Sequence, residues 1–200
     1  MLTIAIQAGG ASSRMGKDKG LMIFNGLPLV QRLVERTAAL ADHCVIITNQ
    51  PNDYRLFPTP KVADVLPGRG SLGGLYTALS AANTDFVAVI ACDMPFASAA
   101  LLAYQYHLIQ QEDADAVIPR VNGKYEPFHA VYRREPCLTY IKKAIDADQW
   151  KAISWIDQVR VREVSTEEVR TFDSHGITFT NVNTPTEFKI AESLDRSLPQ

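Results

Sequence analysis

The stretch that follows the first apolar segment of the chain reads Q-A-G-G-A-S-S-R-M-G-K-D-K, from Gln7 to Lys19. The apolar segment itself, Leu2–Ile6, is typical of a buried strand. Glycine lets backbone N–H groups come close to a ligand, and consecutive N–H groups form a concavity that binds anions. Hydroxyl and cationic side chains add to this surface: Gly9, Gly10, Gly16, Ser12, Ser13, Arg14, Lys17 and Lys19. The stretch therefore predicts a phosphate-binding loop at the carboxyl end of the first strand.

The spacing of this loop excludes two better-known phosphate-binding motifs. A Walker A loop has four residues between its first glycine and the Gly-Lys pair, whereas five separate Gly10 from Gly16. The dinucleotide fingerprint G-x-G-x-x-G fails too, because its third glycine is missing after Gly10. An ordinary surface loop with solvated cations is the alternative. The position directly after the first strand of an expected parallel sheet favours the ligand site.

The residues Ala8–Lys19, A-G-G-A-S-S-R-M-G-K-D-K, resemble the signature of the molybdenum cofactor nucleotidyltransferases, most closely the guanylyltransferases. The neighbouring cytidylyltransferases usually carry Ala-Ala-Gly where this chain has Ala8-Gly9-Gly10. The resemblance implies nucleotide contacts from one set of residues: Gln7, Ala8, Gly9, Gly10, Ser12, Ser13, Lys19, Asn49, Asp64, Gly73 and Asp93. Gln7 departs from the family, which more often has leucine there. Its amide either lies beside the base or simply ends the strand.

Length and composition are those of a globular domain with a sizeable core. The chain has 200 residues, of which 46% are hydrophobic and 21% charged, so we expect residues 1–200 to form a single domain. The net charge of −2 gives no basic field for nucleic acid or a membrane surface. The start of the chain lacks the basic region of a signal peptide. Three widely spaced cysteines indicate reduced thiols, and we expect a cytoplasmic location.

The apolar pattern alternates between strand-like and helix-like segments along the whole chain. It predicts a three-layer α/β fold, with a mostly parallel sheet and helices on both faces. The resemblance implies a Rossmann-like nucleotidyltransferase fold of the GT-A type. Helices are expected to begin near Pro28, Leu72, Ser98, Glu135 and Pro185. The expected strands are 2–6, 44–48, 61–63, 86–91, 114–119, 127–132, 159–164 and 178–182.

The sequence C-D-M-P, Cys92–Pro95, directly follows the most apolar run of the chain. A carboxylate at the carboxyl end of a central strand is well placed for the ligand crevice of an open sheet. Mg²⁺ is usually held by one or two carboxylates and by phosphate oxygens of the substrate. Asp93 is therefore the candidate metal ligand, and the segment is similar to the metal-binding segment of the family. The alternative is a structural aspartate that caps the next turn.

Two further segments carry candidate substrate contacts. Asn181 and Asn183 lie in T-N-V-N-T-P, which is similar to a segment near the family's active site, although Asn and Thr before Pro also make an ordinary helix cap. His129 lies in a strand that borders the second substrate in the family, so it is a candidate contact for the pterin.

A second glycine-rich stretch, Asp64–Gly74, reads D-V-L-P-G-R-G-S-L-G-G and is expected to be a loop. Its glycines allow close backbone approach, and Arg69 could meet phosphate. Ser71 replaces the proline that is usual in the family, which makes the loop more flexible. The resemblance places Asp64 and Asn49 beside the nucleotide, whereas by pattern alone both fit turn positions.

The resemblance implies transfer of GMP from GTP to the phosphate of molybdopterin, with release of pyrophosphate. Mg²⁺ on Asp93, together with Arg14 and Lys19, would offset the charge of the reacting phosphates. The partners implied are GTP, molybdopterin and, transiently, molybdoenzymes or other cofactor-biosynthesis proteins. The alternatives are a cytidylyltransferase on the same cofactor, a sugar-phosphate nucleotidyltransferase and a non-catalytic nucleotide-binding regulator.

Overall fold

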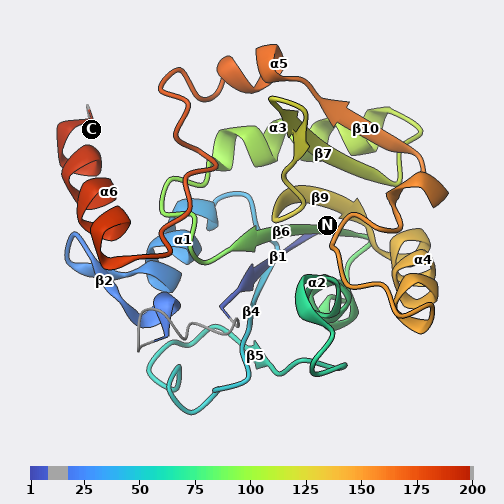
Figure 1. Cartoon of the computed structure of the whole chain (residues 1–200), viewed down its shortest axis with the longest axis horizontal. Coiled ribbons are helices and arrows are strands. Elements are labelled where there is room, and N and C mark those ends of the chain that lie inside the picture. The colour runs from blue at the N-terminus through green and yellow to red at the C-terminus, as the bar shows by residue number, and fades with distance from the viewer. Residues whose placement is uncertain (9–17, 199–200) are drawn as a thin grey trace.

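The computed structural model describes residues 1–8 and 18–198. Strands and helices alternate through most of this length (Figure 1). The strands are β1 Leu2–Gln7, β2 Ile23–Phe24, β3 Leu27–Pro28, β4 His43–Ile47, β5 Lys61–Val62, β6 Phe86–Ala91, β7 Ala116–Val121, β8 Lys124–Tyr125, β9 His129–Arg133 and β10 Val161–Val164. The α-helices are α1 Leu29–Thr37, α2 Gly70–Ala81, α3 Ala99–Gln111, α4 Arg134–Asp146, α5 Thr166–Arg170 and α6 Pro185–Ser197. Short 3₁₀ turns lie at Lys19–Leu21 and Ile156–Gln158.

The main sheet has the strand order β10-β7-β9-β6-β1-β4-β5, with β8 paired to β7. β1 is central and pairs in parallel with both β4 and β6. β9 lies antiparallel to β6 and to β7, so the amino end of β9 meets the carboxyl ends of its neighbours. The expected three-layer, mostly parallel sheet is confirmed, and the reversed strand β9 brings one extra chain segment to the edge where ligands bind in such sheets.

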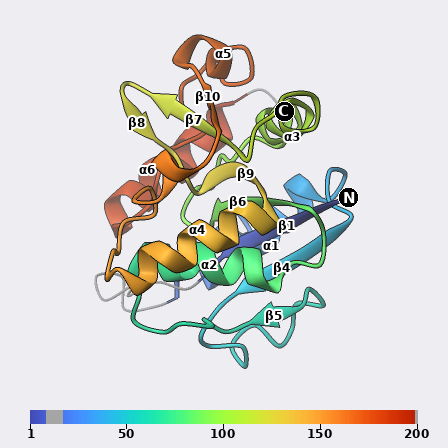
Figure 2. The same ribbon diagram turned by 90° about the vertical axis from the view of Figure 1, so that its right-hand side faces the viewer.

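Helices cover both faces of this sheet. Side chains alternate along β1, so Leu2, Ile4 and Ile6 pack with α1 and α3 on one face, while Ala5 faces α2 and α4. Figure 2 shows α2 and α4 side by side on their face. All of β1 is buried, which explains why its sequence is a continuous apolar run and not an alternating one.

A smaller apolar cluster attaches the last helix to the hairpin β2–β3. Phe24, Phe96 and Phe188 pack edge to face at its centre, and Figure 1 shows α6 beside β2. The hairpin turn has positive φ at Asn25 and Gly26, residues that tolerate this geometry. α6 begins as expected at Pro185, where Thr184 and Glu187 form a reciprocal capping box. The carboxyl-terminal helix is thereby held against the hairpin at residues 23–28.

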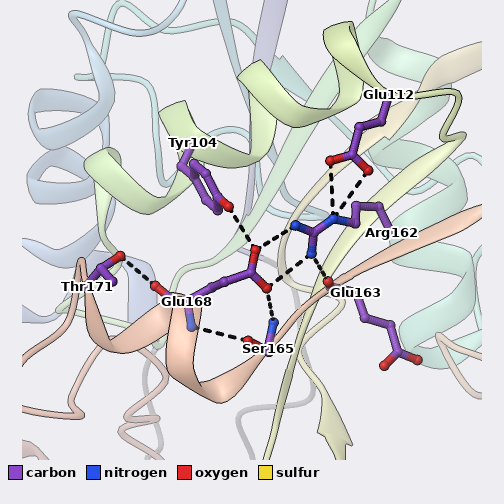
Figure 3. Close-up of polar contacts among 7 residues, drawn as sticks. All are labelled: Tyr104, Glu112, Arg162, Glu163, Ser165, Glu168 and Thr171. Atoms are coloured by element: carbon purple, nitrogen blue, oxygen red, sulfur yellow. Dashed lines mark hydrogen bonds and ion pairs between the residues drawn. The ribbon is translucent and has the colours of Figure 1, made fainter.

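A charged network holds the edge strand β10 against the neighbouring helices (Figure 3). The guanidinium of Arg162 on β10 lies between the carboxylates of Glu168 on α5 and Glu112 at the end of α3. Tyr104 on α3 donates a 2.8 Å hydrogen bond to Glu168. Glu168 also accepts from the backbone of Ser165 in a capping box. This network joins α3, β10 and α5, and it lies away from the sheet edge described below.

The prediction of a strand at 178–182 is wrong. The carboxylate of Asp173 accepts hydrogen bonds from the N–H groups of Ile177 and Thr178, and a turn follows at Thr180. Those donors are therefore not free to join a strand ladder. The N–H of Val182 instead bonds to the carbonyl of Asp93, at 2.9 Å. The segment consequently crosses the carboxyl edge of the sheet without joining it.

The glycine-rich stretch 64–74 is only partly the expected loop. α2 begins at Gly70, two residues before the first position of the apolar repeat that predicted it. Small residues allow the first turn to form where a ligand cleft and another chain segment both come close. The sequence also gave no sign of β8 or of α5, because each is too short to show a repeat.

Candidate active site

The carboxyl edge of the sheet opens into one large cleft of about 1720 Å³. Loops that follow β1, β4, β5 and β6 line it, together with the segment that leads into β9. The sequence-predicted residues that line it are Gln7, Ala8, Lys19, Asn49, Asp64, Asp93 and Asn181. Open α/β sheets bind ligands at this edge, because strand ends and helix starts meet there. The described part of the chain thus gathers most of its predicted site residues in one place.

Lys19 and Asp93 line this cleft, and Asn183, which is not part of the cleft lining, completes a polar cluster with them. Nζ of Lys19 lies 3.1 Å from Oδ2 of Asp93 and 2.6 Å from Oδ1 of Asn183. The side chains of Lys19 and Asp93 are 17% and 23% exposed, so the pair is partly shielded but open to a ligand. Three chain segments meet here: the turn Lys19–Leu21, the end of β6 and the approach to α6. An ammonium group beside a carboxylate and amide oxygens is suited to a phosphate with its counter-ion.

A buried tyrosine holds the turn that carries Lys19, a feature that sequence analysis missed. The hydroxyl of Tyr54 donates a 2.6 Å hydrogen bond to Oδ1 of Asp18, and the same oxygen accepts the N–H of Gly20 at 2.9 Å. Tyr54 is fully buried, and a Cβ at Gly20 would lie 2.4 Å from its hydroxyl. Burial and the neighbouring Asp18 both raise the pKa of Tyr54. A residue larger than glycine at position 20 would therefore collide with the tyrosine hydroxyl.

Asn49 and Asp64 make a reciprocal pair at the other end of the cleft. Nδ2 of Asn49 donates to Oδ2 of Asp64 at 2.8 Å, and the N–H of Asp64 donates to Oδ1 of Asn49 at 2.9 Å. Both residues line the cleft, Asn49 exposed and Asp64 half-buried. The pair joins the ends of β4 and β5, which are adjacent strands. The two predicted nucleotide contacts therefore lie together at the cleft wall.

The amide of Gln7 contacts the first turns of α2. Its Nε2 donates to the carbonyl of Gly74, and a Cβ at Gly74 would lie 3.0 Å from Gln7 Oε1. Gln7 is 8% exposed and still lines the cleft. Gly73, in contrast, is absent from the cleft lining and packs against Arg69 and Leu66. Gly74 is thus the glycine of this pair that faces the site.

The start of α2 is held by a distant segment, Asp148–Trp150. The carbonyl of Trp150 accepts from the N–H of Leu72 at 3.3 Å and from the hydroxyl of Ser71 at 3.2 Å. Arg69 pairs with Asp148 at 2.7 Å and lies over the Trp150 ring. Ser71, which replaces the family's usual proline, is therefore tied down by an external carbonyl. Arg69 is engaged with these partners and does not line the cleft.

His129 does not reach the cleft, which corrects the expectation that it contacts a pterin. Its imidazole is fully buried, Nε2 accepts the N–H of Ser98 at 3.1 Å, and burial lowers its pKa to about 4. Gln105 donates to its carbonyl at 3.0 Å. The ring is therefore neutral at pH 7 and supports the start of α3. Its neighbours Glu126, Pro127 and Phe128 line the cleft in its place.

Five predicted residues, Gly9, Gly10, Ser12, Ser13 and Arg14, lie outside the described residues. The described chain brings both ends of their loop, Ala8 and Asp18, to the cleft. Their assignment as phosphate contacts stays a prediction.

The described residues contain no group of three or more His, Cys, Asp or Glu side chains arranged as a metal cage. The donors beside Lys19 are nonetheless hard oxygens, from the Asp93 carboxylate and the Asn183 amide. Such a set suits Mg²⁺, which completes its shell with water and substrate phosphate. Cys92 is buried, and burial followed by the charge of Asp93 raises the pKa of its thiol, so it fits packing better than metal binding.

Comparison with known proteins identifies the family. Residues 4–161 match the model described as the MobA-like NTP transferase domain. The chain belongs to this family. Its members transfer nucleotides, so this MobA-like chain is a nucleotidyltransferase.

Two relatives of this MobA-like chain are named as probable molybdenum cofactor guanylyltransferases. It is 32% identical over 189 residues to the probable molybdenum cofactor guanylyltransferase of Peptoclostridium acidaminophilum, with coverage of 92% of this chain and 85% of the relative. It is 34% identical to the protein of the same name from Natronomonas pharaonis, with coverage of 94% and 96%. Both relatives thus match nearly end to end.

A solved structure agrees with the fold. The crystal structure of molybdopterin-guanine dinucleotide biosynthesis protein A from Archaeoglobus fulgidus superimposes with a TM-score of 0.85 at 26% identity, covering 98% of this chain and 100% of that one. The expected nucleotidyltransferase fold is confirmed. Within the described residues of this MobA-like chain, no helix has the length and apolar character needed to cross a membrane.

Proposed function

We propose that this protein transfers GMP from GTP to the phosphate of molybdopterin and releases pyrophosphate. The observation that carries the proposal is the contact of Lys19 with Asp93 in the cleft, supported by the contact of Lys19 with Asn183. The names of the relatives, molybdenum cofactor guanylyltransferase, supply the two substrates.

The charge of the reactants decides what the site must do. A phosphate monoester is already anionic near neutral pH, so its attack on the α-phosphorus needs no strong general base. The main barrier is to bring two anions together and to stabilise the charge of the departing pyrophosphate. Lys19 offers a fixed positive charge for this purpose, and Arg14 would add a second. The backbone around Ala8–Ser13 would hold the phosphates in line.

Asp93 is the residue proposed to hold a divalent cation, with Mg²⁺ as the preferred ion. Bound there, the ion would neutralise phosphate charge and act as a Lewis acid. Asn183, and Asn181 at the cleft wall, would orient the ligands around it by hydrogen bonding. Lys19 contacts the same carboxylate, so Asp93 positions the lysine as well as the ion.

The nucleotide base is proposed to bind at the end of the cleft that holds Asn49 and Asp64. These residues, with Gln7 and the backbone of α2 at Gly74, form a polar wall that suits a purine edge. Gly10 favours GTP over CTP through the family resemblance. A cytidylyltransferase acting on the same cofactor is the second candidate, and a comparison of product formed from GTP, CTP and ATP separates the two.

The proposal also covers the cellular location, the domain organisation and the partner proteins. The three cysteines are free in the structure, which supports a reducing, cytoplasmic location. Residues 1–200 are proposed to act as one domain, supported by the continuous main sheet. Transient contact with molybdoenzymes or other cofactor-biosynthesis proteins would deliver the product.

Pyrophosphate release tests the function. Purified protein is mixed with molybdopterin, Mg²⁺ and one nucleoside triphosphate, and pyrophosphate is measured with time. We expect release that requires GTP and molybdopterin together. Release with CTP instead would favour the second candidate. Tight GTP binding without pyrophosphate release, whichever triphosphate is supplied with molybdopterin, would indicate a nucleotide-binding regulator.

A further inference from the structure

Glu126 is an acidic residue of the cleft for which the nucleotide-binding and metal sites give no role. It lies in the connection between β8 and β9 and lines the cleft together with Pro127 and Phe128. Its backbone is fixed at both ends, because its N–H bonds to the carbonyl of Pro119 at 2.9 Å and its carbonyl accepts the N–H of His129 at 3.1 Å. The carboxylate is therefore presented from a rigid support.

No hydrogen bond or ion pair to the Glu126 carboxylate is present among residues 1–8 and 18–198, although every other acidic side chain discussed for the cleft has one. The side chain is only partly exposed, and burial raises the pKa of its carboxyl. A partly desolvated acceptor gains most from a ligand that donates hydrogen bonds to it. The neighbouring ring of Phe128 adds an apolar wall suited to a flat heterocycle.

The position of Glu126 separates it from the end of the cleft proposed for the nucleotide base. Phe128 accepts the N–H of Ala91, the last residue of β6, at 3.0 Å, so this segment lies beside the end of β6. Along the sheet, the strands run β9, β6, β1, β4 and β5. Asn49 follows β4, three strand spacings from β9, which is roughly 14 Å. Lys19 and Asp93 lie between these two ends of the cleft.

We propose that Glu126 recognises the 2-amino-4-oxopyrimidine edge of the acceptor's pterin, accepting hydrogen bonds from its ring N–H and its amino group. This inference rests on the proposed function, because it takes molybdopterin to be the acceptor. Two adjacent N–H donors on a flat ring match the two oxygens of one carboxylate. Guanine presents the same edge, so the experiment must separate the two rings. Three strand spacings, roughly 14 Å, separate the strand that follows Glu126 from the strand that precedes Asn49, which favours the pterin, with the reacting phosphates between the rings.

Direct binding of free pterin tests the recognition without any turnover. Pterin is fluorescent, and its titration with protein is compared with that of 2,4-dioxopteridine, which lacks the 2-amino donor. We expect the wild type to prefer pterin by about 10-fold or more, since a site built for a hydrogen-bond donor rejects the analogue without it. Glu126→Gln should remove most of this preference. Glu167→Gln, the same change on the exposed face of α5, is the matched control and should keep it.

Steady-state kinetics then show whether Glu126 contacts the pterin ring or the guanine ring. Glu126→Gln should raise KM for molybdopterin about 10- to 100-fold, the scale of a lost charge-assisted contact, and leave KM for GTP unchanged. Higher KM for GTP with unchanged KM for molybdopterin would assign the carboxylate to guanine and overturn the inference. Wild-type protein that binds both pteridines equally would overturn it too. If the wild type transfers GMP to molybdopterin and Glu126→Gln leaves both KM values unchanged, only the inference is refuted. If the wild type transfers nothing to molybdopterin, the proposed function is refuted.

Discussion

Nζ of Lys19 lies 3.1 Å from Oδ2 of Asp93, although the two residues are 74 positions apart in the chain. Lys19 is carried by the 3₁₀ turn Lys19–Leu21 and Asp93 by the loop after β6. Because β1 and β6 are adjacent and parallel, their carboxyl ends meet at one edge of the sheet. The fold thus creates the contact on which the proposed chemistry depends.

Removal of the lysine tests the charge that it supplies. We expect Lys19→Ala to lower kcat by about 100- to 1000-fold, as is usual for loss of one preorganised charge stabiliser. Lys142→Ala, on the exposed surface of α4, should retain wild-type kcat. Circular dichroism and thermal melting establish that both variants fold. A folded Lys19→Ala protein with near-normal kcat would remove the lysine from the reaction.

Replacement of Asp93 tests metal binding separately from turnover. Asp93→Asn keeps the shape of the side chain and removes its charge, so Mn²⁺ affinity in the presence of GTP should fall by at least about 10-fold. Electron paramagnetic resonance of free Mn²⁺ measures this directly. Asp157→Asn, outside the cleft lining, serves as the control. Equal Mn²⁺ affinity in Asp93→Asn and wild type would show that another group holds the ion.

The Tyr54 hydroxyl and Gly20 should be strongly coupled in stability. Gly20→Ala places a methyl group 2.4 Å from the hydroxyl, so we expect a loss of about 1–3 kcal/mol in the free energy of unfolding. Tyr54→Phe removes that oxygen and leaves the ring carbon at 3.3 Å as the nearest atom. The double variant should therefore lose less than the sum of the single losses, by about 1 kcal/mol. Urea denaturation of the four proteins measures the coupling, and additive losses would contradict the packing described here.

The Arg162–Glu168 pair should stabilise the protein in a pH-dependent way. The hydrogen bond from Arg162 lowers the pKa of Glu168 from 4.5 to about 2. A carboxyl with a lowered folded-state pKa contributes its stability above its unfolded pKa and loses it as the pH falls toward the folded value. Glu168→Gln should therefore lower the free energy of unfolding by about 1–2 kcal/mol at pH 7, and by less at pH 3.

Chemical denaturation at the two pH values measures this difference. Glu167→Gln, one residue away on the exposed side of α5, is the control and should show no comparable pH dependence. A Glu168→Gln effect that stayed constant from pH 7 to pH 3 would mean that the charge of the carboxylate contributes nothing.

Sequence analysis predicted the central strands well because their signal is local. Phe86–Ala91 is apolar throughout, and its predicted and observed limits coincide. Asp93 could be placed at the ligand edge because it comes just after β6, whose apolar run marks a central strand. Lys19 lies twelve positions beyond the end of β1, and its place at the same edge was expected from the family signature Ala8–Lys19. Thr178–Val182 failed because Asp173 captures backbone donors of that segment, a contact that no pattern of apolar residues encodes.

The residues that support the site could not be predicted, because they act through contacts between segments far apart in the sequence. Tyr54 lies in a proline-rich connection and gave no sign that it would contact Asp18. Trp150 and Asp148 hold the start of α2 across 79 positions of sequence. His129 was placed on the correct strand, but the alternation along β9 buries its ring and leaves the preceding residues at the cleft. Such outcomes depend on tertiary packing.

The central claim is that one triphosphate and its divalent ion bind between Lys19 and Asp93. A crystal structure of the protein with GTP and Mg²⁺ tests it most directly. We predict phosphate oxygens within hydrogen-bonding distance of Nζ of Lys19 and an ion coordinated by the Asp93 carboxylate. A triphosphate bound elsewhere, with the Lys19–Asp93 contact unchanged and no ion at Asp93, would contradict the account.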